Sequence, residues 1–201
     1  MLELKGIFPP HITPFTRHGD VDKDALAGLV RYWISQGSLS LVTCGSNGEA
    51  PYLSREERRL VIKTVLDSAK SDVSIIVGAG VPSTSETVML CRDVKDLGAD
   101  AVLVVSPYYF RPSSEELYFH YKTVAEAVDI PLIIYNVPKF TGYNLEPSLI
   151  TKLAEEFSQI IGVKDSSGSI GQISNLVMNM SRDKAVMAGT ADLIYSSLCI
   201  G

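Results

Sequence analysis

The stretch AVLVVSPYYFRPSSEELYFHYKTVAEAVDIPLIIYN (101–136) contains one complete strand–helix–strand pattern. Its two ends, 101–106 and 131–136, are short continuous apolar runs, which are typical of strands buried on both faces. Between them, one face of a predicted helix carries the apolar residues Leu117, Tyr121, Val124, Ala125 and Val128. A strand, a helix and a strand in this order predict a parallel βαβ unit with a right-handed crossover.

The same pattern repeats along the chain. Apolar strand candidates lie at 6–15, 40–44, 74–79, 101–106, 131–136, 160–164 and 185–189. A serine followed three residues later by a glutamate predicts a capping box at the start of three helices, in the pairs Ser54 with Glu57, Ser83 with Glu86 and Ser113 with Glu116. No linker or low-complexity tract interrupts the series, so we expect one domain over residues 1–201.

Two folds fit this alternation: an open, doubly wound sheet and a closed TIM (β/α)8 barrel. Gly78-Ala79-Gly80 is only a fragment of the GxGxxG dinucleotide motif and gives little support to nucleotide binding. Reactive side chains instead follow several different strands, which favours the TIM barrel. Because 196–201 closes the helix after the seventh strand candidate, we expect a barrel truncated after its seventh βα unit, without the eighth strand.

Composition limits the classes of function. The net charge of −5 and the lack of a basic run argue against nucleic acid as a partner. The N-terminal residues do not resemble a signal peptide, and no apolar run is long enough to suggest a membrane helix. Cys44, Cys91 and Cys199 have no disulfide or zinc spacing, and the histidines form no metal motif, so we expect a cytoplasmic protein without a metal site. We expect Cys44 to be a small buried residue and not a nucleophile.

Lys164 is the most unusual of the strand-end residues. It follows the apolar run Ile160–Val163, so the sequence takes a lysine to the end of a buried strand. Burial of an ammonium group lowers its pKa, and a neutral amine can attack a ketone to form a Schiff base. The alternative is a structural lysine whose ammonium group reaches solvent or pairs with a carboxylate.

Two other strand ends carry side chains or loops suited to the same chemistry. Tyr135 follows an apolar strand and could transfer protons, although it could equally be an ordinary half-buried tyrosine. Gly45-Ser46-Asn47-Gly48 could present backbone N–H groups to a carboxylate, or it could be a tight strand-to-helix loop. Each pattern alone is weak, but all of them fall on the edge of the sheet where TIM barrels place their chemistry.

Together these residues resemble the dihydrodipicolinate synthase / N-acetylneuraminate lyase family of class I, pyruvate-dependent aldolases. The resemblance covers essentially the whole chain. The segments that carry it, in order and at the family's spacing, are ITPF (12–15), GSNGE (45–49), LSREER (53–58), SPYYFRP (106–112), YNVPKFTG (135–142) and GVKDSSG (162–168).

The resemblance implies a role for each matching residue. Lys164 aligns with the Schiff-base lysine, and Tyr135 with the tyrosine that moves protons, relayed through Ser46. Ser46 and Asn47, with Gly48 beside them, align with the loop that holds the keto acid's carboxylate. Tyr109 aligns with a tyrosine that reaches a neighbouring subunit's site, which implies a dimer or homotetramer. Gly189 lies in the loop that shapes the distal pocket, and no cofactor is implied.

Family synthases that use aspartate semialdehyde carry an arginine where this chain has Phe140. A phenyl ring cannot grip a carboxylate, and Lys139 should point elsewhere in an extended chain. We therefore expect an aldolase that joins pyruvate to an aldehyde, or cleaves a 2-keto-3-deoxy sugar acid or a related 2-oxo acid. Asn47, in place of a second hydroxyl residue, also suits a 4-hydroxy-2-oxoglutarate aldolase. The alternatives are the synthase that uses pyruvate and aspartate semialdehyde, and a non-catalytic relative that binds 2-oxo acids. The family's C-terminal helical extension is also absent from the sequence.

Overall fold

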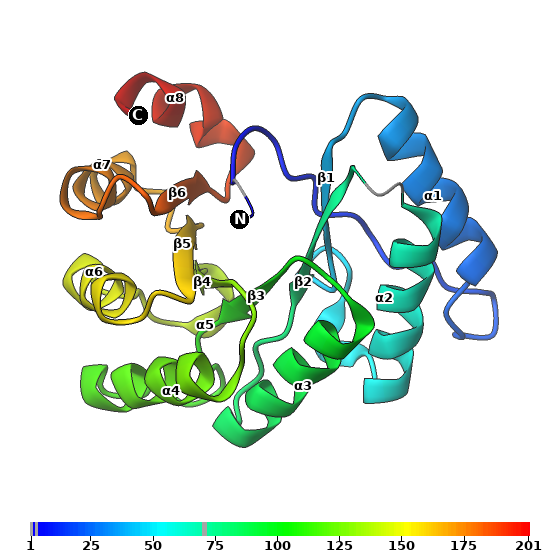
Figure 1. Cartoon of the computed structure of the whole chain (residues 1–201), viewed down its shortest axis with the longest axis horizontal. Helices are drawn as coiled ribbons and strands as arrows, with labels where there is room; N and C mark the ends of the chain where they lie inside the picture. The colour runs from blue at the N-terminus through cyan, green and yellow to red at the C-terminus, as the bar shows by residue number, and fades with distance from the viewer. Residues whose placement is uncertain (1, 3, 70–71) are drawn as a thin grey trace. The chain divides into compact units, whose positions relative to one another are not determined.

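The computed structural model describes residues 2, 4–69 and 72–201. The chain divides into two compact units: Met1–Ala79 with Met89–Leu103, and Gly80–Val88 with Val104–Gly201. Strands and helices alternate along the chain in both units (Figure 1). This alternation confirms the repeated βα pattern predicted from the sequence.

The first unit contains β1 (Ser40–Thr43), β2 (Ser74–Gly78) and most of β3 (Ala101–Val105), which pair in parallel in chain order. Its helices are α1 (Lys23–Ser35), η1 (Ala50–Tyr52), α2 (Arg55–Ser68) and the second half of α3 (Thr84–Leu97). Helices α1 and α2 lie side by side (Figure 1). Apolar residues of β1 and β2 form the centre of this unit's core, because both strands are buried along most of their length.

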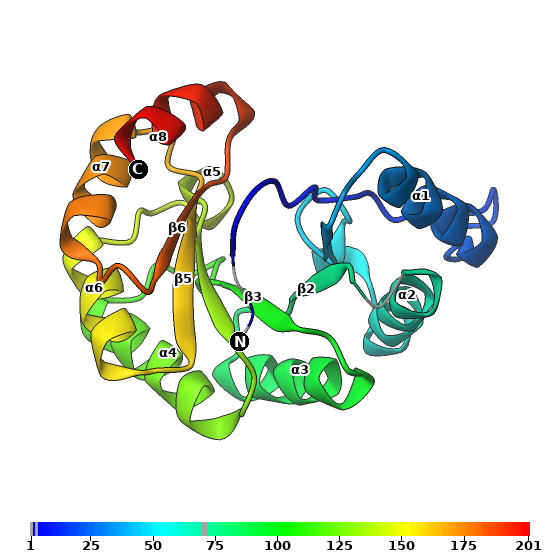
Figure 2. The same cartoon turned by 45° about the horizontal axis from the view of Figure 1, so that its top comes forward.

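The second unit contains β4 (Leu132–Asn136), β5 (Ile160–Asp165) and β6 (Ala185–Ala188), which again pair in parallel in chain order. Its helices, after the first turn of α3, are α4 (Ser114–Ala127), α5 (Pro138–Thr141), α6 (Pro147–Glu156), α7 (Ile170–Asn179), η2 (Ala191–Leu193) and α8 (Ile194–Ile200). Figure 2 shows α4, α6 and α7 along one side of β4, β5 and β6. All five residues of β4 are buried, whereas β6 is half-buried.

The predicted strand at 6–15 is wrong. Only two isolated bridges form there, between Pro10 and Val42 and between Phe15 and Val21. In the first, the N–H of Val42 donates to Pro9 O at 2.9 Å, and the N–H of His11 donates to Val42 O at 3.2 Å. Pro9, Pro10 and Pro14 have no N–H to continue a ladder. This segment therefore follows β1 without becoming a regular strand, and the described residues contain six strands where the sequence predicted seven.

The predicted helix starts are largely confirmed. Ser54 and Ser113 form complete capping boxes with the glutamates three residues later. At α3 the Ser83 hydroxyl accepts a hydrogen bond from the N–H of Glu86 at 3.3 Å and lies 3.0 Å from the Ser85 hydroxyl. These side chains satisfy N–H groups that have no partner inside the helix.

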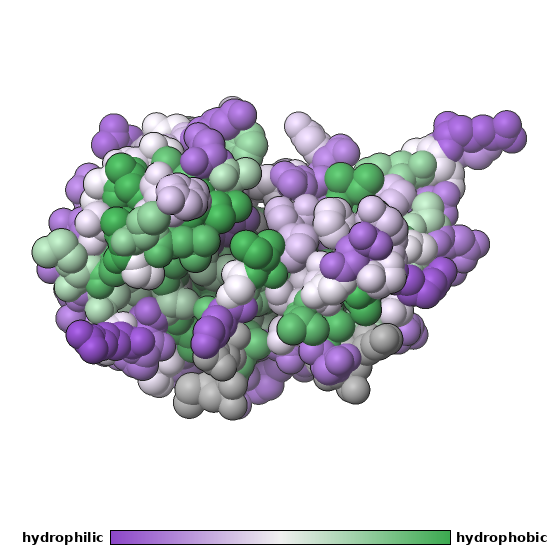
Figure 3. Space-filling view, turned by 90° about the horizontal axis from the view of Figure 1, so that it is seen from above, coloured by the Kyte–Doolittle hydropathy of each residue, from purple (hydrophilic) through white to green (hydrophobic). Residues whose placement is uncertain are grey.

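Apolar side chains are exposed on α7 and α8. Met178, Tyr195 and Leu198 are each at least 74% exposed. In Figure 3, hydrophobic side chains gather over the part of the second unit that carries these helices. A surface of this kind is typical of an interaction face. Within the described residues, none of the helices combines the length and the apolar character needed to cross a membrane.

Candidate functional site

Lys164 and Tyr135 lie side by side at the ends of β5 and β4. They are direct register partners in the parallel ladder, and Lys164 Nζ lies 4.6 Å from the centroid of the Tyr135 ring. The next register pair, Asn136 and Asp165, bonds to Gln172 of α7 and to the N–H of Leu145. Because side chains alternate across a strand, Lys164 and Tyr135 point to the sheet face opposite to α7.

The surroundings of Lys164 favour its neutral form. Its side chain is largely enclosed, and burial lowers the pKa of its ammonium group below the usual value. The Tyr135 ring is 7% exposed and offers its face to the amine. A buried amine beside a phenol is an arrangement that can attack a carbonyl and transfer protons.

Gly189 follows β6 and packs against Lys164 and the two residues after it. Its N–H donates to Asp165 O at 2.7 Å. A Cβ at this position would lie 2.0 Å from Ser166 Oγ and 3.2 Å from Lys164 Cε, so only glycine fits without a shift of its neighbours. Lys164 therefore lies between the Tyr135 ring and Gly189 as a neighbour of both.

Ser166 is a polar residue at this position that the sequence analysis did not select. Its Oγ is buried and has no hydrogen-bond partner among the described residues. The hydroxyl lies close to Gly189 and follows Lys164 by two residues. That spacing places both side chains on one face of an extended segment, which is the signal that could have identified it.

Ser46, Asn47 and Gly48 form a tight turn after β1, in the first unit. The N–H of Gly48 donates to Gly45 O at 3.1 Å, and the N–H of Glu49 donates to Ser46 O at 3.2 Å. The Asn47 side-chain amide donates to Pro10 O at 3.3 Å, which anchors the loop to the N-terminal segment. Of the N–H groups in Gly45–Gly48 that could bind a carboxylate, that of Gly48 is thus used within the turn, while the Ser46 and Asn47 side chains are exposed.

Arg58, from the LSREER segment, supports the chain that follows this loop. Its side chain is buried and donates to Ala50 O at 2.5 Å, Leu53 O at 3.4 Å and Gly78 O at 3.5 Å. These three carbonyl groups lie in η1, just after it, and at the end of β2. The arginine therefore fixes the geometry of the segment after GSNGE by hydrogen bonds.

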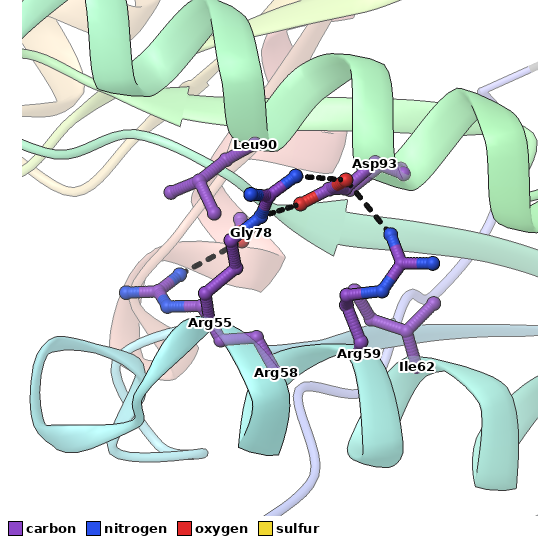
Figure 4. Close-up of a pocket in the computed structure, with 8 residues that line it drawn as sticks. Arg55, Arg58, Arg59, Ile62, Gly78, Leu90 and Asp93 are labelled. Atoms are coloured by element: carbon purple, nitrogen blue, oxygen red, sulfur yellow. Dashed lines mark hydrogen bonds and ion pairs between the residues drawn. The ribbon is translucent and has the colours of Figure 1, made fainter.

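Figure 4 shows the small pocket in the first unit to which this arginine belongs. Arg55 donates to Asp93 through two nitrogens, at 2.6 and 2.8 Å, and Arg59 donates to the same carboxylate at 2.7 Å. The hydrogen bond from Arg55 is the main cause that lowers the pKa of Asp93. Since each guanidinium already has a partner, we interpret the cluster as a link between α2 and α3 in the first unit.

Tyr109 lies in the loop after β3, in the second unit. Its side chain is 89% exposed, its φ is +83°, and its ring meets that of Phe110 edge to face at a centroid distance of 4.9 Å. A left-handed conformation is costly for a residue with a bulky side chain. The backbone thus holds an aromatic pair out toward solvent, as a contact with another subunit would require.

Phe140 is 59% exposed on the short helix α5. The expectation that Lys139 would point elsewhere in an extended chain is wrong, because Pro138 begins a helical turn here and Gly142 ends it at a φ of +79°. Lys139 Nζ lies 5.7 Å from the centroid of the Phe140 ring. A cation is therefore present at the position where the sequence alone indicated only an apolar ring.

The expectation that Cys44 is a small buried residue is confirmed. Burial raises the pKa of Cys44 to about 11 and that of Cys91 to about 12, so both thiols stay protonated. Gly78 permits the close approach of the chain at the end of β1, because a Cβ there would lie 2.0 Å from Cys44 O. No group of three or more potential metal ligands occurs in the part of the chain that the structure describes.

Comparison with known proteins supports these assignments of fold and class. Residues 3–201 match the model of the dihydrodipicolinate synthetase family. The chain is 40% identical over 199 residues to the 4-hydroxy-tetrahydrodipicolinate synthase of Methanothrix thermoacetophila, covering 98% of this chain and 66% of that protein. It thus spans about two thirds of the length of such relatives.

Two solved structures have nearly the same fold as this chain. One is the chloride-inhibited dihydrodipicolinate synthase of Acinetobacter baumannii complexed with pyruvate, which is 40% identical with a TM-score of 0.96 and covers 99% of this chain and 68% of that one. The other is a prophage protein of E. coli K12 in complex with pyruvate, described as belonging to the dihydrodipicolinic acid synthase family. It is 32% identical, its TM-score is 0.95, and the match covers 98% of this chain and 67% of that one.

The repeated parallel βα units and these solved structures define the fold class of the chain, which is that of the pyruvate-complexed synthase-family proteins just described. Within that class, the chain belongs to the dihydrodipicolinate synthetase family. The resemblance stated from the sequence motifs is confirmed.

Proposed function

We propose that this chain carries the lysine-dependent site of a lyase that joins pyruvate to an aldehyde, with Lys164 as the Schiff-base residue. The observation that carries the proposal is the enclosed Lys164 amine, of lowered pKa, 4.6 Å from the centroid of the Tyr135 ring. Two relatives of known structure hold pyruvate, which supports pyruvate as the keto acid.

The proposed chemistry uses only side chains of the chain itself. Neutral Lys164 attacks the ketone carbon of pyruvate, and loss of water leaves a protonated imine. The imine accepts electrons when a methyl proton leaves, so an enamine forms and its carbon attacks the aldehyde. Hydrolysis then releases the product and regenerates the amine. Tyr135 moves the protons, with Ser46 as the relay implied by the family's motif.

For the aldehyde, we propose aspartate semialdehyde and hence the activity of a 4-hydroxy-tetrahydrodipicolinate synthase. The names of the relatives favour this alternative over the sugar-acid aldolase expected from the sequence. Lys139 Nζ, 5.7 Å from the centroid of the Phe140 ring, supplies a cation beside the position where the family's synthases usually carry an arginine. The sugar-acid aldolase stays a second candidate, because Phe140 offers no guanidinium.

We also propose a TIM barrel as the fold and a dimer or tetramer as the assembly. The parallel pairing in each unit and the TM-scores of 0.95 and 0.96 support a TIM (β/α)8 barrel, of which this chain would hold the first part. The exposed Tyr109–Phe110 pair supports a dimer or tetramer in which Tyr109 reaches a neighbouring site. A cytoplasmic location remains the expectation from composition.

The test is reductive trapping. Pyruvate with borohydride should add one reduced pyruvyl group to the folded protein, and peptide mass spectra should locate it on Lys164. Lys164→Arg should give no adduct, because a guanidinium stays protonated. A folded wild-type protein without an adduct would favour the non-catalytic relative. Turnover of aspartate semialdehyde against glyceraldehyde then decides between the two lyase reactions.

A further inference from the structure

The ladder between β4 and β5 contains one irregularity. Leu132 lies opposite Ile160, but Ile133 lies opposite Gly162, so Ile161 is an extra residue on β5. Beyond this β-bulge the pairing is regular up to the strand ends. A bulge of this kind changes which face the following side chains reach.

The bulge decides where Lys164 points. If the pairing that begins at Leu132 and Ile160 continued without it, Tyr135 would lie opposite Val163, and Asn136 would lie opposite Lys164. A one-residue slip in a ladder moves side chains to the other face. Lys164 would then point away from Tyr135.

The pair Asn136 and Asp165 holds the register beyond the bulge. Both side chains are fully buried, and Asn136 Nδ2 donates to Asp165 Oδ2 at 2.7 Å. Asn136 Oδ1 in turn accepts from the N–H of Leu145 at 3.0 Å. The amide of Asn136 is therefore oriented by the loop before α6, so that its NH2 group faces Asp165.

Asp165 accepts its remaining hydrogen bonds from Gln172 and Ser167. Gln172 Nε2 donates to Oδ2 at 2.7 Å, and the N–H of Ser167 donates to Oδ1 at 3.0 Å. The Ser167 hydroxyl donates to Oδ1 as well. Asp165 therefore accepts hydrogen bonds from Asn136, Gln172 and Ser167, and the surroundings of its side chain are arranged for an acceptor.

The slipped register would leave this carboxylate without its partner. Asn136 is the last residue of β4, so a slip by one residue would leave no β4 residue opposite Asp165. A buried polar group that loses a hydrogen bond is unfavourable. We infer that Asn136 and Asp165 form a register lock, two positioning residues that select the bulged pairing and so keep Lys164 beside Tyr135. The inference rests on the proposed function only for its effect on catalysis.

The experiment compares three variants with the wild-type protein. Asp165→Asn replaces one carboxylate oxygen by an NH2 group, which would face the donors that now bind Asp165. The exchange Asn136→Asp with Asp165→Asn returns one carboxylate and one amide to the pair. Ile150→Val, a truncation of a fully buried side chain in α6, is the control for a loss of stability alone.

Two readouts are measured on each folded variant, with thermal unfolding alongside. The first is the nuclear Overhauser effect between the 13C-methyl groups of reductively methylated Lys164 and the Tyr135 ring, which needs no substrate. The second is the rate of pyruvate trapping by borohydride. Asp165→Asn should lose the Overhauser effect and slow trapping by about a hundredfold or more, because a misplacement of only ~1 Å can already cost about a hundredfold. The exchange should restore both, and Ile150→Val should keep both.

Retention of the Overhauser effect in folded Asp165→Asn would overturn the register lock. Where Asp165→Asn does not fold, the exchange decides: recovery of folding and of the Overhauser effect supports the lock, and failure to recover overturns it. Absence of trapping in the wild-type protein would refute the proposed function alone, because the Overhauser effect still tests the lock.

Discussion

Lys164 and Tyr135 face each other across the ends of β5 and β4, with the amine nitrogen 4.6 Å from the centroid of the ring. The sequence separates them by 28 intervening residues, and the parallel ladder makes them direct partners. This contact explains how the chain can hold a lysine in an apolar setting. The ring face offers favourable electrostatics to the ammonium form, while burial favours the neutral amine.

The rate of pyruvate trapping should rise with pH and reach its plateau below the pH at which an ordinary lysine becomes neutral. Burial lowers the pKa of Lys164, and only the neutral amine attacks. Below that pKa the rate should change by about tenfold per pH unit. The measurement is initial trapping rate against pH. A plateau reached only near the pKa of a free lysine would contradict the burial argument.

The lowered pKa of Lys164 also makes the stability of the fold depend on pH. Between the lowered pKa and the unfolded-state value, the unfolded chain binds more protons at Lys164 than the folded chain does, so this residue's contribution to stability increases as pH rises. Lys164→Met should therefore stabilise the fold at neutral pH and reduce the difference in stability between neutral and alkaline pH. Urea titrations at two pH values test both effects.

Tyr135→Phe should keep the adduct and lose turnover. The phenyl ring can still pack over Lys164, but it has no hydroxyl to transfer a proton. General acid–base catalysis contributes about 10²–10⁴-fold, so turnover should fall by that order while trapping changes little. The comparison of both rates in one preparation checks this. Equal losses of trapping and turnover would assign Tyr135 a packing role.

Gly189→Ala should impair the lysine site specifically. The new Cβ would lie 2.0 Å from Ser166 Oγ and 3.2 Å from Lys164 Cε. Overpacking of this kind costs about 1–3 kcal/mol. The matched control is Gly171→Ala in α7, where the nearest atom is 3.7 Å away and alanine favours the helix. Addition of Ser166→Ala to Gly189→Ala should recover part of the stability, as measured by thermal unfolding.

Phe140→Arg should raise the preference for aspartate semialdehyde over glyceraldehyde. A guanidinium can grip the semialdehyde's carboxylate, and a charge-assisted bond of about 1.5–3 kcal/mol corresponds to about one to two decades in specificity. The measurement is kcat/KM for both aldehydes at saturating pyruvate. Lys139→Met should lower the same ratio if the lysine holds that carboxylate. An unchanged ratio in both variants would remove α5 from the aldehyde site.

Tyr109→Gly should separate stability from assembly. Glycine adopts a φ of +83° without strain, so the change should leave thermal stability equal or slightly higher, by about 1 kcal/mol. Loss of the aromatic ring should weaken subunit association and slow turnover. Sedimentation velocity and kinetics, measured against Tyr109→Phe, provide the test. An unchanged oligomer with full activity would argue that Tyr109 faces only solvent.

Much of the fold was predictable from local pattern. Continuous apolar runs predicted β1 to β6 to within about one residue, because strands buried on both faces need apolar side chains at every position. Capping serines predicted the starts of α2 and α4, since a helix end needs local partners for its N–H groups. The run at 6–15 misled because apolar content alone does not reveal the N–H groups that its prolines lack.

The sequence by itself therefore determined the βα repeat, the family and the identity of the strand-end lysine and tyrosine. Only the tertiary structure decided which face these side chains share. That face depends on a one-residue bulge at Ile161 and on a buried bond between Asn136 and Asp165. Hydrophobic periodicity does not encode such a shift, because the residues of β5 directly before and after Ile161 are apolar. Register is decided by pairing between segments far apart in the chain.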